Sequence, residues 1–190
     1  MNKRNLILIG LAVVVVLQLA VPAWMILERE RTLREGQVFK FKTRPVDPAD
    51  AFRGRYVFLS LEPDAVKVPD AGAWRYGQKA FAVLGTGTDG FVLVKRLERT
   101  RPAGESALQV RVSWADNLAG SLHINWQGLD RYYMTEKKAP AAETAYREHS
   151  RRTNQDCAIT VRVLGSVGVI ENLFIEDQPI QAWLKDYKAK

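Results

Sequence analysis

The residues that could carry chemistry are few and widely spaced. Two histidines, His123 and His149, and a lone cysteine, Cys157, are the candidate bases, metal ligands and nucleophile. Neither histidine has a ligand-type partner at short spacing, so no metal site is expected at either. Cys157 opens an alternating apolar stretch, and we expect it to be a small core residue and not a reactive thiol. The pattern therefore predicts no catalytic residue, no metal and no cofactor.

A pair of carboxylates, Asp47 and Asp50, is the other candidate for acid–base chemistry. They lie between Pro45 and Arg53, with Pro48 between them. Prolines fix their own φ, and aspartates cap nearby backbone amides, so this spacing favours a shaped loop over a pair of catalytic carboxylates. We expect these residues to cap and pair within the domain or to form a docking surface.

The loop runs into a predicted strand over 56–61. Gly54 allows a turn just before it. The alternation predicts one face with Tyr56, Phe58 and Ser60, and an opposite face with Val57, Leu59 and Leu61. The loop and strand together form the stretch around which we expect the rest of the chain to be organised.

This stretch resembles the signature of the GDYXXLXY family, membrane-associated bacterial proteins with a P-V-D-P-x-D-x-F-R loop before the naming motif. The matching residues are Pro45, Val46, Asp47, Pro48, Asp50, Phe52, Arg53, Gly54, Tyr56 and Leu59. Arg55 stands where the family has Asp, and Leu61 stands where it has the last Tyr. The chain therefore lacks the carboxylate and the phenol that the family pattern has at these two positions.

A second stretch, Asp130-Arg131-Tyr132-Tyr133, is similar to the family's E-R-Y-F/Y sequence before a short helix. The resemblance implies no established biochemical activity. It implies multi-spanning membrane proteins as partners, because related domains are found next to or fused with such segments.

An apolar run near the N-terminus predicts a membrane anchor. Leu6–Leu27 contains no charged residue. As a helix with a rise of about 1.5 Å per residue it is about 33 Å long, against a hydrocarbon core of about 30 Å. We expect this segment to contact membrane lipid, and the charged residues 28–35 to extend the helix until Gly36 ends it.

A cleaved signal peptide is the alternative to a retained anchor, because Val21-Pro22-Ala23 resembles a cleavage site. The anchor is favoured because the apolar run continues through Leu27 and Trp24 suits a membrane interface. Positive residues flank the run on both sides, so they do not set its orientation. We expect a bacterial inner-membrane protein with its C-terminal domain in the periplasm, since a short basic tail before an apolar run is typical of export signals.

The 190 residues are enough for one such anchor and one domain. We predict a mainly β (α+β) fold: an anchor and juxtamembrane segment over 1–35, and a β-rich domain over 36–190 with a single short internal helix. The predicted strands are 38–43, 56–61, 78–84, 91–97, 108–114, 157–164, 167–170 and 173–175. The helix is predicted over 140–151, residues 63–72 are expected to be irregular, and Trp74 and Tyr76 are expected to dock.

The net charge of +7 is a modest basic bias. It fits either a solvated surface or proximity to anionic lipid headgroups. Nucleic-acid binding is not expected for two reasons. The aromatic residues lie in predicted strands, and a domain tethered outside the cytoplasm does not meet nucleic acid.

We expect a non-catalytic interaction or assembly component that works with a multi-spanning membrane protein. One alternative is a degenerate relative of type I signal peptidases. Residues 53–58 and Lys95-Arg96 loosely resemble two of their sequence boxes, but no serine lies between Leu27 and Arg53 for Lys95 to activate. The other alternative is a periplasmic small-ligand-binding module.

Overall fold

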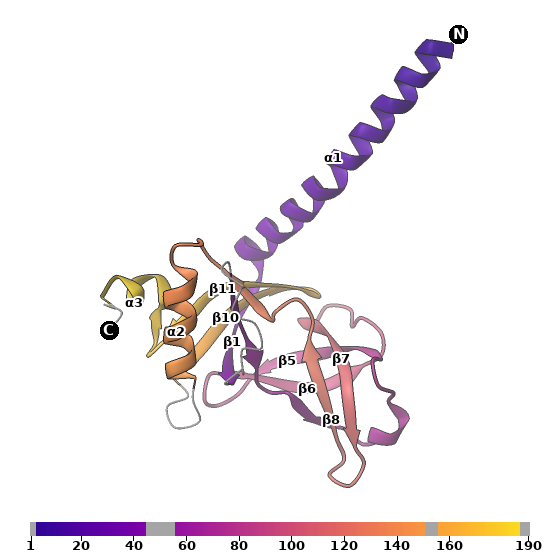
Figure 1. Ribbon diagram of the computed structural model, residues 1–190. Coiled ribbons are helices and arrows are strands. Elements are labelled where there is room, and N and C mark those ends of the chain that lie inside the picture. Colours follow the sequence, from indigo (N-terminus) through magenta and orange to yellow (C-terminus); the bar gives the residue numbers. More distant parts are fainter. Residues whose placement is uncertain (1–2, 45–55, 151–155, 187–190) are drawn as a thin grey trace.

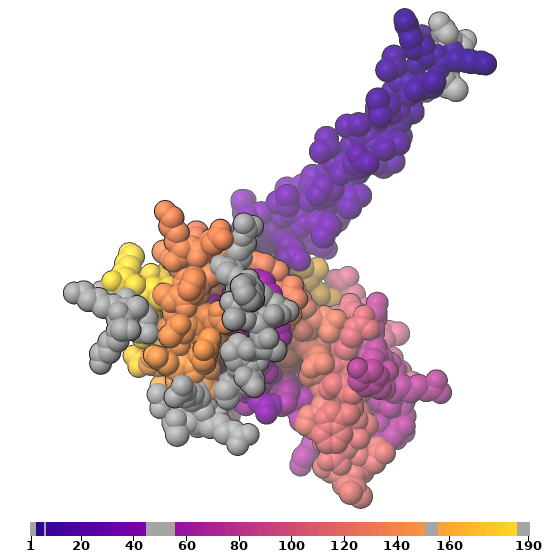
Figure 2. Space-filling model, in the orientation of Figure 1, coloured from indigo at the N-terminus to yellow at the C-terminus, as the bar shows by residue number. Residues whose placement is uncertain are grey.

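The computed structural model describes residues 3–44, 56–150 and 156–186. It consists of a long helix, α1 (Lys3–Glu35), that projects from a mainly β domain (Figure 1). The space-filling view shows the helix standing clear of the domain over most of its length (Figure 2). The predicted fold class is confirmed.

Among the described residues, α1 is the one helix long and apolar enough to cross a membrane. Its apolar side chains are exposed from Ile7 to Leu27. The helix ends at Glu35, as the glycine at position 36 predicted, and Gly36 donates its amide to the carbonyl of Thr32 at 2.9 Å. The charged end of α1 contacts two strands of the domain, so the helix passes directly into the fold.

The first sheet has five strands and begins directly after α1. Their order is β12 (Gln178–Pro179), β11 (Val167–Ile175), β10 (Cys157–Leu164), β1 (Gln37–Arg44) and β3 (Ser60–Leu61). All neighbours are antiparallel. The stretches predicted as separate strands over 167–170 and 173–175 form the single strand β11. The pairing of β11 with β10 continues across a bulge, where the register shifts between Thr160 and Val161.

The second sheet also has five strands. Their order is β4 (Ala65–Lys67), β8 (Ser121–Trp126), β7 (Ala107–Asp116), β5 (Lys79–Thr86) and β6 (Val92–Glu98). The predicted hairpin is confirmed as β5–β6. The connection expected to be irregular contains β4 and a 3₁₀ turn, η1 (Ala71–Ala73), because β4 pairs with β8 at the sheet edge. Trp74 packs against the core, but Tyr76 is 86% exposed and does not dock.

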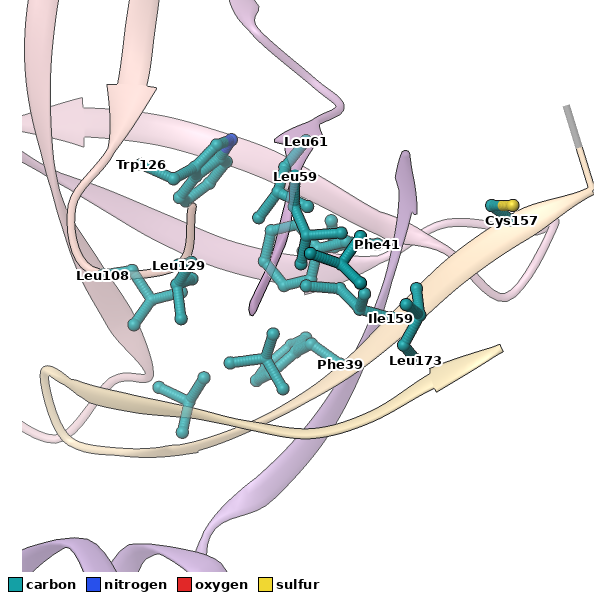
Figure 3. Close-up of a cluster of buried hydrophobic side chains, with 14 of the residues drawn as sticks. Phe39, Phe41, Leu59, Leu61, Leu108, Trp126, Leu129, Cys157, Ile159 and Leu173 are labelled. Atoms are coloured by element: carbon teal, nitrogen blue, oxygen red, sulfur yellow. The ribbon is translucent and has the colours of Figure 1, made fainter. Parts of the chain in front are cut away.

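The core lies between the two sheets (Figure 3). Phe41 from β1 meets Trp126 from β8 edge to face, with ring centroids 5.1 Å apart. The indole Nε1 of Trp126 donates to the carbonyl of Pro63 at 3.0 Å, so its polar atom is satisfied inside the core. This contact joins the first strand after the anchor to the second sheet.

Two short helices pack against the β domain. The predicted helix is α2 (Ala139–His149), which begins one residue before Pro140. A further helix, α3 (Ile180–Asp186), was not predicted. Its signal is present in the sequence, because Ile180, Trp183 and Leu184 have the i, i+3, i+4 spacing of a helix face and all contact the core.

We predict that Gly36→Ala destabilises the domain by about 1–3 kcal/mol, the usual cost of overpacking. A Cβ at this position would lie 2.4 Å from the Thr32 carbonyl oxygen and 3.0 Å from the Val163 amide, and neither backbone atom can rotate away. Thermal unfolding of the full chain in detergent, followed by circular dichroism, measures the change.

Gly72→Ala is the matched control, since its Cβ would meet nothing closer than 3.7 Å. It is expected to change stability by less than about 0.5 kcal/mol. Equal melting temperatures for the two variants would contradict a close-packed junction at Gly36.

Candidate functional site

The first predicted motif is only partly covered by the described residues. Outside them lie Pro45, Val46, Asp47, Pro48, Asp50, Phe52, Arg53, Gly54 and Arg55. Tyr56 opens strand β2 (Tyr56–Phe58), and Leu59 stands between β2 and β3. The predicted alternation is confirmed, because Val57, Leu59 and Leu61 are all buried.

The structure pairs the described end of the first motif with the second motif. Strand β2 pairs antiparallel with β9 (Arg131–Tyr133), so Tyr56 faces Tyr133 and Phe58 faces Arg131. The amide of Leu59 continues this pairing by donating to the carbonyl of Asp130 at 2.8 Å. We call this two-stranded unit, β2 with β9, the motif ribbon.

The outer face of the motif ribbon is aromatic and basic. The rings of Tyr56 and Tyr133 meet edge to face with centroids 5.7 Å apart, and the guanidinium of Arg131 lies 5.1 Å from the Tyr56 centroid. The guanidinium of Arg131 donates a hydrogen bond to the Tyr133 hydroxyl, and this bond together with the charge of Asp130 raises the pKa of Arg131. Phe58 is 39% exposed and Tyr133 is 66% exposed. The face therefore offers solvent an ordered group of two kinds of side chain that are enriched at protein interfaces.

The inner face holds the ribbon in place. Val57 is fully buried, and Tyr132 opposite it is half-buried. Burial raises the pKa of Tyr132, while hydrogen bonds with Gln181 and the backbone of Leu173 oppose this rise. These contacts tie the ribbon to α3 and β11.

A cleft of about 540 Å³ begins at the edge of the ribbon. Phe58 and Asp130 line it on the ribbon side, and Trp114 and His123 line it on the side of the second sheet. Trp114 and His123 stack with centroids 4.1 Å apart and planes 8° from parallel, and Trp114 is 51% exposed. The cleft thus extends the aromatic surface of the ribbon toward β7 and β8.

Charged groups gather at one end of this cleft. Asp64 accepts a hydrogen bond from Arg44, and its Oδ2 lies 4.0 Å from Nδ1 of His123. That separation is too long for a hydrogen bond. Within the described part of the chain, no hydrogen bond links His123 to Ser60 or Ser113, the serines of the cleft. The group offers charge and a stacked aromatic surface within one cleft.

Cys157 lies where the alternation predicted, at the start of β10 and in the core (Figure 3). Burial raises the pKa of its thiol to about 12. The thiol is therefore neutral at physiological pH, and only the thiolate is a strong nucleophile.

Tyr146 on α2 forms a hydrogen bond with Arg44, the last described residue before the first motif. Its ring is buried, and its hydroxyl donates to the carbonyl of Arg44 at 3.0 Å. Burial raises the pKa of the phenol well above its usual value. The helix that follows the second motif thus holds the chain where it enters the first.

One of three comparisons with known proteins gives a match. The family model described as GDYXXLXY protein matches residues 18–169, from the apolar part of α1 to the start of β11. The chain belongs to the GDYXXLXY family. Searches of curated proteins and of solved structures give no significant match.

Two features of this GDYXXLXY protein were missed by sequence reasoning. The cleft residues Trp114 and His123 come from different strands, and their stacking follows from pairing between β7 and β8. His149 was considered alone, but it lies beside Asp156 and Glu176, with ligand atoms within 4.8 Å of one another. No local spacing could reveal that group, because its members come from three elements.

We predict that the family motif separates into structural and surface positions. Leu59→Ala empties a buried site and is expected to cost about 2–5 kcal/mol of stability. Tyr133→Ala removes an exposed ring and its aromatic pair, so the loss should be at most about 1.5 kcal/mol. Chemical denaturation of both variants checks this order, and the reverse order would contradict it.

A pH-dependent effect is expected for Tyr146→Phe. Near neutral pH the variant loses a buried hydrogen bond, at a cost of about 1 kcal/mol. The wild type is destabilised above about pH 10, because the unfolded phenol ionises there while the folded phenol, with its raised pKa, does not. The stability gap should therefore narrow as pH rises past 10, and a pH-independent gap would contradict the assignment.

Proposed function

We propose that this GDYXXLXY protein is a single-pass, membrane-anchored assembly component that binds a multi-spanning membrane protein and catalyses no reaction. The observation that supports this proposal most is the motif ribbon, because the described end of the first motif pairs there with the second motif. On the inner face they pack into the core, and on the outer face they expose aromatic and basic side chains.

The composition of that surface supports a protein partner. Tyr, Phe and Arg are enriched at the centres of interfaces, where rigid aromatic rings bury large areas at low entropy cost. Tyr56, Arg131 and Tyr133 already hold one another in place, so little ordering remains for binding to impose. The adjoining cleft is large enough to receive side chains of the partner.

Membrane anchoring is supported by the length and apolar character of α1. A domain held at the bacterial inner membrane meets other membrane proteins at a high effective concentration, so a small docking surface suffices. We place the domain in the periplasm, because a short basic tail before an apolar run is typical of an export signal.

A small ligand in the cleft is the second candidate. It is favoured by the stacked pair of Trp114 and His123, which offers a flat aromatic surface beside the charge of Asp64. An inactive relationship to signal peptidases is the third. It rests on the sequence boxes alone, and in the structure the Lys95 side chain lies against Gly85 on the exposed side of the second sheet.

Site-specific cross-linking in membranes of the native host tests the docking proposal. A photo-reactive amino acid in place of Tyr133 should capture a multi-spanning membrane protein, identified by mass spectrometry. The same amino acid in place of Tyr76 is the matched control, since that tyrosine is also exposed but lies away from the ribbon. Arg131→Glu, added to the position-133 probe, should reduce the captured amount at least severalfold.

Equal capture from both positions, or no specific protein from either, would overturn docking through the ribbon. Protease treatment of intact spheroplasts from the same cells tests the periplasmic side, where cleavage of the domain is the expected result. A domain protected until the membrane is broken would overturn that side alone.

A further inference from the structure

Three side chains from three separate segments converge at the end of the first sheet where β10 begins and β11 ends. His149 is the last residue of α2, Asp156 directly precedes β10, and Glu176 lies in the turn between β11 and β12. One ligand atom from each lies within 4.8 Å of the others. From this convergence we infer a binding site for a divalent first-row transition cation, with Zn²⁺ as its representative.

Backbone hydrogen bonds hold the three positions together. The amide of Asp156 donates to the carbonyl of His149 at 3.2 Å, and the amide of Glu176 donates to the carbonyl of Asp156 at 3.0 Å. Both residues of the two-residue turn have positive φ, 51° at Glu176 and 60° at Asp177, as in a type I′ hairpin. The main chain therefore brings the side chains together before any ion binds.

The state of the His149 ring points to a ligand. Its Nδ1 atom is buried and has no hydrogen-bond partner among the described residues. A buried polar atom without a partner is costly, and Nδ1 is the atom nearest the carboxylate of Glu176. The ring is held by Trp183 of α3, which packs against it edge to face with centroids 5.3 Å apart.

The spacing suits coordination better than a hydrogen bond. Nδ1 of His149 lies 3.5 Å from Oε1 of Glu176. Zinc bonds of about 2.0–2.2 Å at tetrahedral angles place two ligand atoms about 3.4 Å apart. Asp156 and Glu176 are exposed, so their carboxylates can close the remaining distance by small rotations.

The ligand types narrow the class of cation. An imidazole favours zinc and its first-row neighbours over calcium and magnesium, which prefer oxygen ligands alone. Two carboxylates neutralise the charge of the ion. Bound there, the ion links the end of α2 to β10 and to the turn after β11, so it stabilises the side of the domain opposite the second sheet.

Calorimetric titration of the full chain in detergent with ZnCl₂ tests the inference. The chain must be purified without a polyhistidine tag. Wild type should bind one Zn²⁺ and melt at a higher temperature when saturated. His149→Ala and Glu176→Gln should each weaken binding at least about tenfold and abolish the thermal shift.

Two matched variants keep the test specific. Asp177→Asn removes the neighbouring carboxylate, which pairs with Lys40 at 2.8 Å, and His123→Ala removes the other histidine. Both should bind Zn²⁺ like wild type. Because Glu176 is exposed, Glu176→Gln is expected to fold even where His149→Ala does not.

Cobalt provides a local signal. Co²⁺ at the site should absorb in the visible range and quench the fluorescence of Trp183, and this part of the quenching should vanish in Trp183→Phe. Absence of Zn²⁺ binding, equal binding by wild type and Glu176→Gln, or binding of Ca²⁺ in place of Zn²⁺ would each overturn the inference.

Discussion

The fold depends on one extended segment that changes its hydrogen-bonding partner at Leu59. Before this residue β2 pairs with β9, and after it β3 pairs with β1, so one segment joins the motif ribbon to the first sheet. Leu59 keeps its own amide satisfied through Asp130 and buries its side chain in the core. Since a one-residue slip would turn the buried face toward solvent, the alternation from Tyr56 to Leu61 fixes the register on both sides of the change.

This constraint explains why the outer face of the ribbon can remain open. A two-stranded ribbon is marginally stable alone, so its stability must come from the inward side chains, Val57 and Tyr132. The core therefore does not depend on the outward side chains, which are Tyr56, Phe58, Arg131 and Tyr133. A partner can cover these residues without disturbing the fold, which is the property that a docking surface requires.

The junction between helix and domain adds a second constraint. α1 enters β1 through Gly36 alone, and its last turns contact β10 and β11. Thr32 is fully buried at this contact. A helix joined in this way cannot swing freely, so α1 and the first sheet hold a preferred orientation. The proposed cation site lies on the same sheet, beside α2 and α3, so a bound ion would stiffen the helices that contact the ribbon.

Interactions between residues close together in the chain allowed much of this structure to be predicted from the sequence. The uncharged run up to Leu27, the glycine that ends α1, the hairpin of β5 and β6 and the alternation in the motif strand all depend on neighbours within a few residues. Tertiary structure decided the rest. The pairing of Tyr56 with Tyr133, the stacking of Trp114 on His123 and the approach of His149 to Glu176 join residues from separate elements. Such contacts depend on which strands pair, in which register, and on how separate segments meet at the end of a sheet, and the local sequence pattern does not specify these.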